Sequence, residues 1–208
     1  SIVENTKAPI VFHILHDDTL NEMNKNKLSL IADNSGNGIE FHHFNPDIFG
    51  SLADSMNRFT IGTMFRIMLP DIMPDLKKII YLDSDLFVNT DIEELWNLNI
   101  DNYCLAAAQD CSTIRNWGTP YAVAAGQTSR DRYFNAGVLC MNLDNIRKNG
   151  SLFQQVMDYL NDNPRTWLPD QDALNAIFSG KTLMVDEKWN YFIDEARKNN
   201  EKAEKKIY

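Results

Sequence analysis

The amino-acid sequence predicts an α/β protein with a Rossmann-like, mostly parallel sheet and helices on both faces of that sheet. Strand-like apolar runs, such as those at 10–16, 79–82 and 103–108, alternate along the chain with segments of helical spacing. This alternation implies right-handed crossovers, which place helices against a mostly parallel sheet. The 208 residues are 44% hydrophobic and 24% charged, a composition that suits one globular domain covering 1–208.

The first part of the chain contributes two predicted strands with a helix between them. Pro9 opens a strand at 10–16. Residues 20–33 are moderately amphipathic and predict a helix that closes at Asn34-Ser35-Gly36. An edge strand follows at 39–44.

The same part of the chain raises the question of a metal site. Four ligand-type residues lie close together in sequence: His13, His16, Asp17 and Asp18. His13, however, alternates with apolar neighbours, and 17–19 resembles a strand end and helix cap. We therefore favour structural roles for this group, and structural or solvent-facing roles for His42 and His43.

A further helix is predicted over 60–69, where apolar residues recur at helical spacing and Pro70 lies beyond the end. Arg66 lies off this apolar stripe. Two interpretations are open for it. It is either a charge on a solvated helix face or a guanidinium whose fork suits the phosphate or hydroxyl oxygens of a ligand.

The chain is organised around the stretch 77–88, KKIIYLDSDLFV, in which an apolar run ends in two carboxylates. An unbroken run of this kind suits a strand buried on both faces. On such a strand Asp83 and Asp85 point to the same face and can share one ligand. Ligands bind beyond the carboxyl ends of strands in α/β sheets, and paired hard oxygens suit Mg²⁺ or Mn²⁺ bound with a diphosphate. The competing interpretation is a turn, because Asp and Ser bond readily to nearby backbone.

The rest of the chain continues the alternation of strands and helices. Four further elements are predicted in chain order: a short helix at 92–96, a strand at 103–108, two helical pieces in 144–162 broken at 149–151, and a strand at 182–186. The segment 110–132 shows no sustained period, so it is either an acceptor-side or lid segment or an irregular surface excursion. The charge-rich run 195–206 predicts a solvated helix or a frayed end.

Two polar motifs interrupt these later elements. The strand 133–141 carries Asn135-Ala136-Gly137 near its start, where the small pair permits a ligand to approach the backbone and the Asn135 amide offers both a donor and an acceptor to its hydroxyls. The alternative is a bulge in a central strand. Asp170 opens the helix that carries 173–178, where an acid also suits an N-terminal cap.

Five stretches occur in an order that is typical of one enzyme family: FRIMLPDIMP (65–74), IIYLDSDLFV (79–88), LFVNTDIEELW (86–96), RYFNAGVLCMNL (132–143) and LPDQDALNAIF (168–178). Together they resemble the retaining glycosyltransferases of family 8, relatives of glycogenin and of the bacterial lipopolysaccharide galactosyl- and glucosyltransferases. The resemblance extends from about residue 9 to 190 and implies the GT-A fold of nucleotide-diphospho-sugar transferases.

The resemblance also implies a reaction and a set of site residues. A hexose moves from UDP-glucose or UDP-galactose to a saccharide or glycolipid acceptor, with retention at the anomeric carbon. Asp83 and Asp85 are the implied ligands of Mn²⁺ (or Mg²⁺), and four residues are implied donor contacts: Arg66, Ser84, Asn135 and Ala136. Asp170 and Gln171 are the implied catalytic residues, the acid touching the donor sugar and the glutamine lying near its anomeric face. Because a neutral amide is a poor nucleophile, double displacement through Gln171 and front-face attack both stay open.

Two segments typical of the family have no counterpart in this sequence. One is an earlier strand that holds uracil and ribose, and the other is a His-x-x-Gly-x-x-Lys-Pro-Trp pattern whose His binds the metal. We expect that both are trimmed from the sequence; a divergent member with an incomplete metal site is the alternative. The competing function is a non-catalytic sugar-nucleotide-binding or structural domain. A nucleotidyltransferase is disfavoured because the sequence has no Gly-rich phosphate loop.

Composition excludes several other classes of protein. A formal net charge of −9, from 20 basic and 29 acidic residues, argues against nucleic acid as a partner. Cys104, Cys111 and Cys140 lack the spacing of a zinc site or a disulfide framework, and we expect Cys104 and Cys140 in the core. No window reaches the length of a membrane span and no signal pattern is seen, so the sequence predicts a cytoplasmic protein. Peripheral membrane association through the missing segments and the oligomeric state both stay open.

Overall fold

The computed structural model describes residues 1–49, 61–111, 132–164, 166–192 and 206–208. The chain divides into two compact units: Lys7–Arg66 forms the smaller, and Ser1–Thr6 with Ile67–Tyr208 forms the larger. In the described residues, no helix combines the length and the apolar character that crossing a membrane requires. The expectation that 1–208 form one domain stays a prediction.

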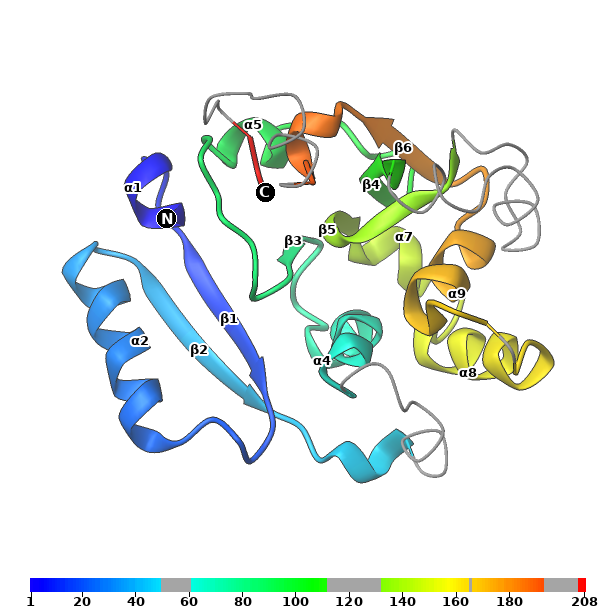
Figure 1. Ribbon diagram of the computed structural model, residues 1–208, viewed down its shortest axis with the longest axis horizontal. Coiled ribbons are helices and arrows are strands. Elements are labelled where there is room, and N and C mark those ends of the chain that lie inside the picture. Colours follow the sequence, from blue (N-terminus) through cyan, green and yellow to red (C-terminus); the bar gives the residue numbers. More distant parts are fainter. Residues whose placement is uncertain (50–60, 112–131, 165, 193–205) are drawn as a thin grey trace. The chain divides into compact units, whose positions relative to one another are not determined.

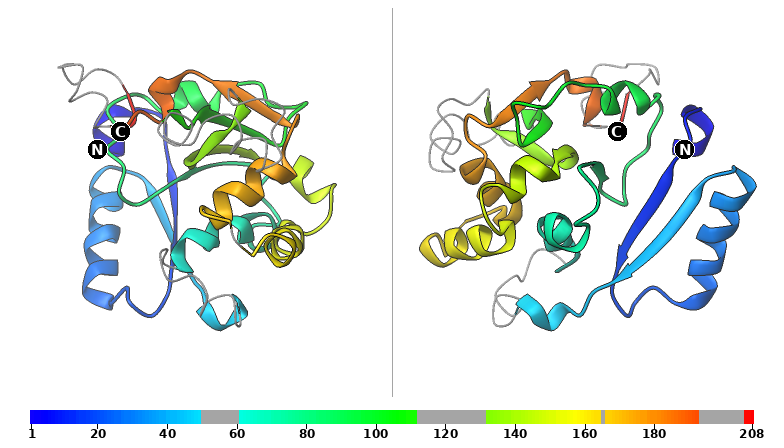
Figure 2. Two further views of the ribbon diagram at one scale, coloured as in Figure 1. Left: turned by 45° about the vertical axis from the view of Figure 1, so that its right-hand side comes forward. Right: turned by 180° about the vertical axis from the view of Figure 1, so that it is seen from behind.

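The smaller unit is built on a pair of parallel strands, β1 (Val11–His16) and β2 (Gly38–His43). The helix α2 (Glu22–Asn34) connects them and runs alongside the pair on one side in both figures (Figures 1 and 2). The Lys25 ammonium lies 5.9 Å from the centroid of the Phe41 ring, so the sheet face that carries Phe41 is the one turned toward α2. The strands and the helix were predicted within a few residues of these bounds.

The start of α2 differs from the expectation that 17–19 form a helix cap. The N-cap is Asn21, whose side chain accepts a hydrogen bond from the Asn24 backbone N–H at 2.9 Å. The Asp17 carboxylate instead accepts hydrogen bonds from the backbone and the hydroxyl of Thr19 at 2.9 and 2.6 Å. These bonds lower the pKa of the Asp17 carboxyl, with the Thr19 hydroxyl as the largest cause.

The predicted helix at 60–69 is a 3₁₀-helix, η2 (Ile61–Met68), followed directly by the α-helix α4 (Leu69–Ile72). Pro70 was expected beyond the helix end, and this was wrong. It lies in the first turn of α4, where the missing N–H costs no intrahelical hydrogen bond.

The larger unit contains a four-stranded sheet, and its strands are listed here in spatial order: β3 (Lys78–Leu82), β5 (Phe134–Asn142), β4 (Leu105–Gln109) and β6 (Thr182–Val185). β5 runs antiparallel to both of its neighbours, whereas β4 and β6 are parallel. The expectation of a mostly parallel sheet holds by strand direction, because β3, β4 and β6 all run the same way. The reversal of β5 was not predicted, because the alternation of strands and helices implies crossovers that keep successive strands parallel.

Short helices complete the larger unit, and they are listed in chain order: α1 (Ile2–Asn5), α5 (Glu93–Trp96), α7 (Leu143–Arg147), α8 (Leu152–Asp162), α9 (Pro169–Ile177) and the 3₁₀-helix η4 (Glu187–Trp189). α9 contacts both β5 and α8. The predicted break at 149–151 is confirmed. Gly150 there has a φ of 94°, and Ser151 caps α8 by accepting from the Gln154 N–H.

The core of the larger unit centres on β4 and β5. Nearly every residue of these two strands is buried, including Cys140, and Cys104 is buried just before β4, as expected for small core residues. β3 was expected to be buried on both faces, but each of its residues is partly exposed. At the chain end, Ile207 is buried and pairs with Val88. Of the charge-rich run 195–206, only Lys206 lies in the described residues.

Candidate active site

Asp83 directly follows β3 and is fixed at its carboxyl end. Its backbone N–H donates to the Gly137 carbonyl oxygen over 2.9 Å, which extends the pairing of β3 with β5 by one residue. The Tyr81 hydroxyl donates to Asp83 Oδ1 at 2.7 Å. The Asp83 side chain is partly exposed. The carboxylate is thus oriented by two elements of the sheet while keeping access to solvent.

Ser84 and Asp85 lie in a turn after the strand, and both are exposed. The sequence argument placed Asp83 and Asp85 on one face because side chains alternate along a strand. That argument was wrong, since β3 ends at Leu82 and the two-residue period does not continue through the turn. The turn interpretation of Asp-Ser-Asp is correct for the backbone, and it leaves two carboxylates at the carboxyl end of β3.

Asn135 and Gly137 form the second part of the candidate site. Asn135 Oδ1 accepts from the Gly137 N–H at 2.8 Å and from Asn190 Nδ2 at 2.7 Å. A Cβ on residue 137 would lie 3.0 Å from Asn135 Oδ1 and 3.1 Å from Asp83 Oδ2. Glycine therefore leaves room for the Asn135 and Asp83 side chains, which would have to shift by a few tenths of an ångström to admit a Cβ.

The same segment interrupts the pairing of β4 with β5. Ala107 lies opposite Leu139, but Gln109 lies opposite Phe134, so the register shifts around Asn135–Val138. The bulge that was the alternative interpretation of Asn135 is thus present. It releases the Ala136 N–H from the ladder, and this N–H donates to a side chain instead.

That side chain is Gln171, near the start of α9. Its Oε1 accepts from the Ala136 N–H at 2.9 Å, and its Nε2 donates to Asp110 Oδ2 at 2.8 Å and to the Tyr133 hydroxyl oxygen at 3.2 Å. Both ends of the amide are therefore engaged, and Gln171 is 7% exposed. Gln171 and the Asn135–Gly137 segment, which are far apart in sequence, are brought together here.

Asp110 was not among the candidates from the sequence. It is 2% exposed, directly follows β4, and accepts from Gln171 Nε2 and, at 3.4 Å, from Asn135 Nδ2. A signal for it existed: like Asp83, it is an acid at the end of an apolar strand. The segment 112–131 that follows lies outside the described residues, as does most of the predicted lid or surface excursion.

Asp170 and Asp172 both lie in the first turn of α9, and both are buried. The N-cap position belongs to Leu168, so the interpretation of Asp170 as the cap was wrong. The side chain that accepts hydrogen bonds at the start of this helix is that of Asp172. Its Oδ1 accepts from the Tyr133 hydroxyl at 2.6 Å, and its Oδ2 accepts from the Leu168 N–H at 3.2 Å and from the Thr166 hydroxyl.

Arg66 belongs to the smaller unit and is 3% exposed. Its Nε donates to the Thr63 carbonyl oxygen at 2.9 Å. The interpretation of Arg66 as a solvated helix charge is therefore wrong. A buried guanidinium presents up to five donors in a fixed fork, which suits recognition of oxygen-rich groups.

The histidines of the smaller unit divide into two groups. His16 is buried and its Nδ1 lies 2.8 Å from the Asp17 carbonyl oxygen, whereas His43 is exposed and pairs with Asp18 at 2.8 Å. His13 and His42 lie against each other, with 3.0 Å between His13 Nδ1 and His42 Nε2. The structural roles expected for His16, Asp17 and Asp18 fit these contacts, whereas those expected for His13 and His42 stay predictions.

The fold matches that of known glycosyltransferases. A crystal structure of the galactosyltransferase LgtC, in complex with donor and acceptor sugar analogues, superposes with a TM-score of 0.77 at 22% identity. The match covers 96% of this chain and 86% of LgtC. The likeness confirms the predicted GT-A class of α/β fold.

Curated proteins of similar sequence were also found. General stress protein A of Bacillus subtilis is 30% identical over 172 residues, which cover 80% of this chain and 58% of that protein. The lipopolysaccharide 1,3-galactosyltransferase of Salmonella typhimurium is 25% identical over 198 residues, covering 91% of this chain and 56% of the enzyme. The chain thus spans a little more than half the length of the curated relatives it matches. Residues 1–208 match the family described as Glycosyl transferase family 8, and the chain belongs to that family.

Proposed function

We propose that this chain carries the catalytic site of a retaining glycosyltransferase that moves glucose or galactose from a UDP-sugar to a hydroxyl of a saccharide or glycolipid acceptor. The observation that carries the proposal is a continuous polar network. It runs from the backbone N–H of Asp83 through Gly137 and Asn135 to Asp110 and Gln171, so that residues of β5 and α9 and the residues directly after β3 and β4 share one set of contacts. Family membership supplies the reaction class.

Asp83 and Asp85 suit a divalent cation such as Mn²⁺ or Mg²⁺. Both are carboxylates at the carboxyl end of β3, Asp83 is oriented by Tyr81, and Asp85 is exposed in the adjoining turn. Hard oxygen ligands of this kind are the ones these ions prefer. A bound cation would neutralise charge on the leaving nucleotide diphosphate, so that no side chain has to protonate it.

Four residues are proposed to bind the donor: Arg66, Ser84, Asn135 and Ala136. Ser84 is exposed between the two carboxylates, whereas Ala136 is buried at the bulge of β5 and is proposed as a donor contact on the family resemblance. The Asn135 amide is held between Asn190 and Asp110. Because its Oδ1 already accepts two hydrogen bonds, the second N–H of Nδ2 is the group that would donate to a sugar hydroxyl.

Asp170 and Gln171 are proposed to face the reacting sugar. The contacts of Gln171 argue against a double displacement through this residue. Its Oε1 already accepts from the Ala136 N–H, and a neutral amide is weakly nucleophilic. We therefore propose front-face attack by the acceptor hydroxyl, with Gln171 holding the Ala136 backbone and Asp110 in place.

A transfer assay tests the proposal. The full gene product is incubated with UDP-glucose or UDP-galactose, Mn²⁺ and a panel of saccharide and glycolipid acceptors, and the product linkage is read by NMR. We expect transfer with an α-linked product from these α-linked donors. Binding of UDP-sugar without transfer to any acceptor would favour the non-catalytic alternative, and a β-linked product would exclude retention.

A further inference from the structure

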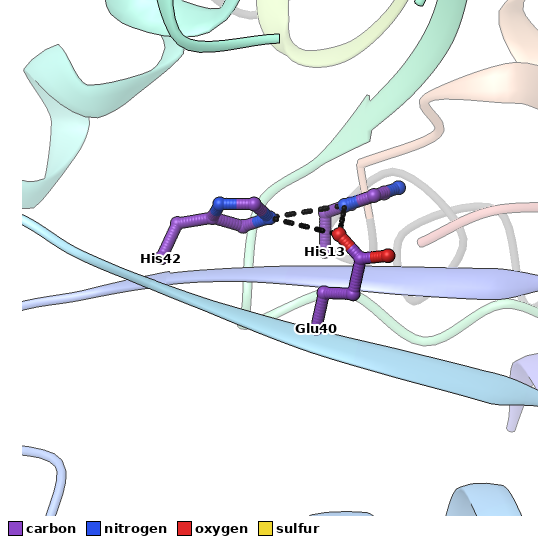
Figure 3. Close-up of side chains that lie close together, drawn as sticks. All are labelled: His13, Glu40 and His42. Carbon is purple, nitrogen blue, oxygen red and sulfur yellow. Dashed lines mark hydrogen bonds and ion pairs between the residues drawn. The ribbon is translucent and has the colours of Figure 1, made fainter.

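We propose that His13, Glu40 and His42 form a zinc-binding site in the smaller unit, separate from the carboxylates that follow β3. The three side chains converge above one face of the β1–β2 pair (Figure 3). In the described residues they are the only group of three or more His, Cys, Asp or Glu whose ligand atoms all lie within 4.8 Å of one another.

The strand register explains why these residues meet. His13 on β1 lies directly opposite Glu40 on β2, and opposite residues of paired strands share a face. His42 lies two positions beyond Glu40, so its side chain returns to that same face. Phe41 lies between them and points to the face turned toward α2. The three ligand-type side chains therefore project from the sheet face opposite α2.

The distances between the ligand atoms fit one metal ion. His13 Nδ1 lies 3.0 Å from His42 Nε2 and 3.4 Å from Glu40 Oε2, and His42 Nε2 lies 3.8 Å from Glu40 Oε2. Tetrahedral zinc with ligand bonds of about 2.0–2.2 Å separates its ligand atoms by about 3.3–3.6 Å. Side-chain rotations that move the ligand atoms by a few tenths of an ångström would bring the three observed distances into the tetrahedral range.

The ligand set selects the kind of ion. Two imidazoles and one carboxylate are a common set for Zn²⁺, and imidazole is favoured by Zn²⁺, Cu²⁺ and Ni²⁺ over Mg²⁺ and Mn²⁺. Three protein ligands leave a fourth position for water or another ligand.

The site is open to ions from solution. The side chains of His13 and His42 are 15% and 25% exposed, and that of Glu40 is 60% exposed. A bound ion would join β1 to β2 through side chains, in addition to their backbone hydrogen bonds. Zinc should therefore stabilise the smaller unit, because a ligand that binds only the folded state raises its stability.

Zinc titration of metal-free protein tests the proposal, with calorimetry for affinity and Co²⁺ absorption spectra for tetrahedral geometry. We expect one zinc ion per chain at this site, with affinity lowered at least about tenfold by His13→Ala, His42→Ala or Glu40→Gln. His43→Ala is the matched control, since His43 is an exposed histidine on the other face of β2. A protein carrying Asp83→Asn and Asp85→Asn should keep the zinc affinity of the unmodified protein, and excess Mg²⁺ should not displace the zinc.

Thermal melts complete the test. Zinc should raise the melting temperature of the unmodified protein and of His43→Ala, but not of His42→Ala. Glu40→Gln separates loss of zinc binding from loss of folding. It changes an exposed side chain, so without metal this variant should melt at the temperature of the unmodified protein. The proposal is overturned if the unmodified protein does not bind zinc, if Glu40→Gln binds zinc as tightly as the unmodified protein, or if His43→Ala loses as much affinity as His42→Ala.

Discussion

Gln171 donates from its Nε2 to Asp110 Oδ2 over 2.8 Å, which ties the start of α9 to the end of β4. The other end of the amide accepts from the Ala136 N–H, so the bond to Asp110 fixes which way the amide faces. Asp110 thereby becomes a positioning residue for two members of the proposed site, Gln171 and Asn135.

Asp110→Ala should lower kcat for sugar transfer by about tenfold or more while changing the donor KM much less, because it disturbs orientation more than binding. Asp110→Asn keeps an acceptor oxygen for Gln171 and should recover part of the loss. Steady-state kinetics of both variants check this. A merely structural role for Asp110 would instead give lower stability with kcat per folded molecule unchanged in both variants.

Gly137→Ala should weaken donor binding, because the new Cβ would lie 3.1 Å from Asp83 Oδ2 and 3.0 Å from Asn135 Oδ1. Both side chains must move by a few tenths of an ångström. Gly150→Ala is a useful control, since its φ of 94° makes alanine strained at a place that contacts no candidate residue. Both variants should lose roughly 1 kcal/mol of stability, but only Gly137→Ala should raise the donor Kd.

The two carboxylates after β3 should make donor binding depend on metal. UDP-sugar should bind with Mn²⁺ or Mg²⁺ and not in EDTA, and Asp83→Asn and Asp85→Asn should each abolish transfer. Calorimetry with and without chelator measures the first effect. If the donor binds equally well in EDTA and in Mn²⁺ or Mg²⁺, the proposed role of a metal in donor binding is wrong.

The positions of the strands could be predicted from the sequence, and so could their directions, except that of β5. All six described strands fall on apolar runs that were predicted within a few residues. The reversal of β5 was missed because strand direction depends on the path of the preceding connection, and apolar spacing contains no information on that path. The partial exposure of β3 was missed for a related reason, since a run of apolar residues does not specify what covers each face.

The candidate site was predicted partly from physical pattern and partly from the family resemblance. Asp83 and Asn135 were candidates from strand position and side-chain chemistry, the role of Gln171 came from the resemblance alone, and the structure brings all three into one network. Asp110 shares with Asp83 the position of an acid after an apolar strand, but its contact with Gln171 depends on the end of β4 meeting α9, which the sequence does not show. The cluster of His13, Glu40 and His42 depends on the pairing register of two strands, which a single sequence does not contain.

Asp170 and Asp172, two residues apart on α9, should separate function from stability. Asp170→Asn should reduce turnover far more than it weakens binding of UDP alone, because its proposed contact is to the sugar. Asp172→Asn should mainly lower stability, by about 2 kcal/mol, since the carboxylate accepts hydrogen bonds from Tyr133, Leu168 and Thr166. Urea unfolding and kinetics on both variants distinguish the roles. If Asp170→Asn lowers the affinity for UDP and for UDP-sugar equally, Asp170 does not contact the donor sugar.

Cys140 should make the protein less stable in alkali. Burial of its thiol in β5 raises its pKa from an ordinary 9.0 to about 11, with Lys78 opposing the shift. Between pH 9 and 11 the unfolded chain therefore loses a proton that the folded chain keeps, so the free energy of unfolding falls as pH rises. The full effect is roughly 3 kcal/mol, present below pH 9 and lost by pH 11.

Urea unfolding at pH 8 and at pH 10.5 measures this contribution, with Cys140→Ala as the variant that cannot titrate. The unmodified protein should lose more stability between the two pH values than Cys140→Ala does, even if the variant is less stable at both because of the small cavity it creates. Cys111→Ala is the control, because Cys111 is a partly exposed thiol outside the core. If Cys140→Ala and the unmodified protein show the same pH dependence, the Cys140 thiol is not protected from ionisation by the fold.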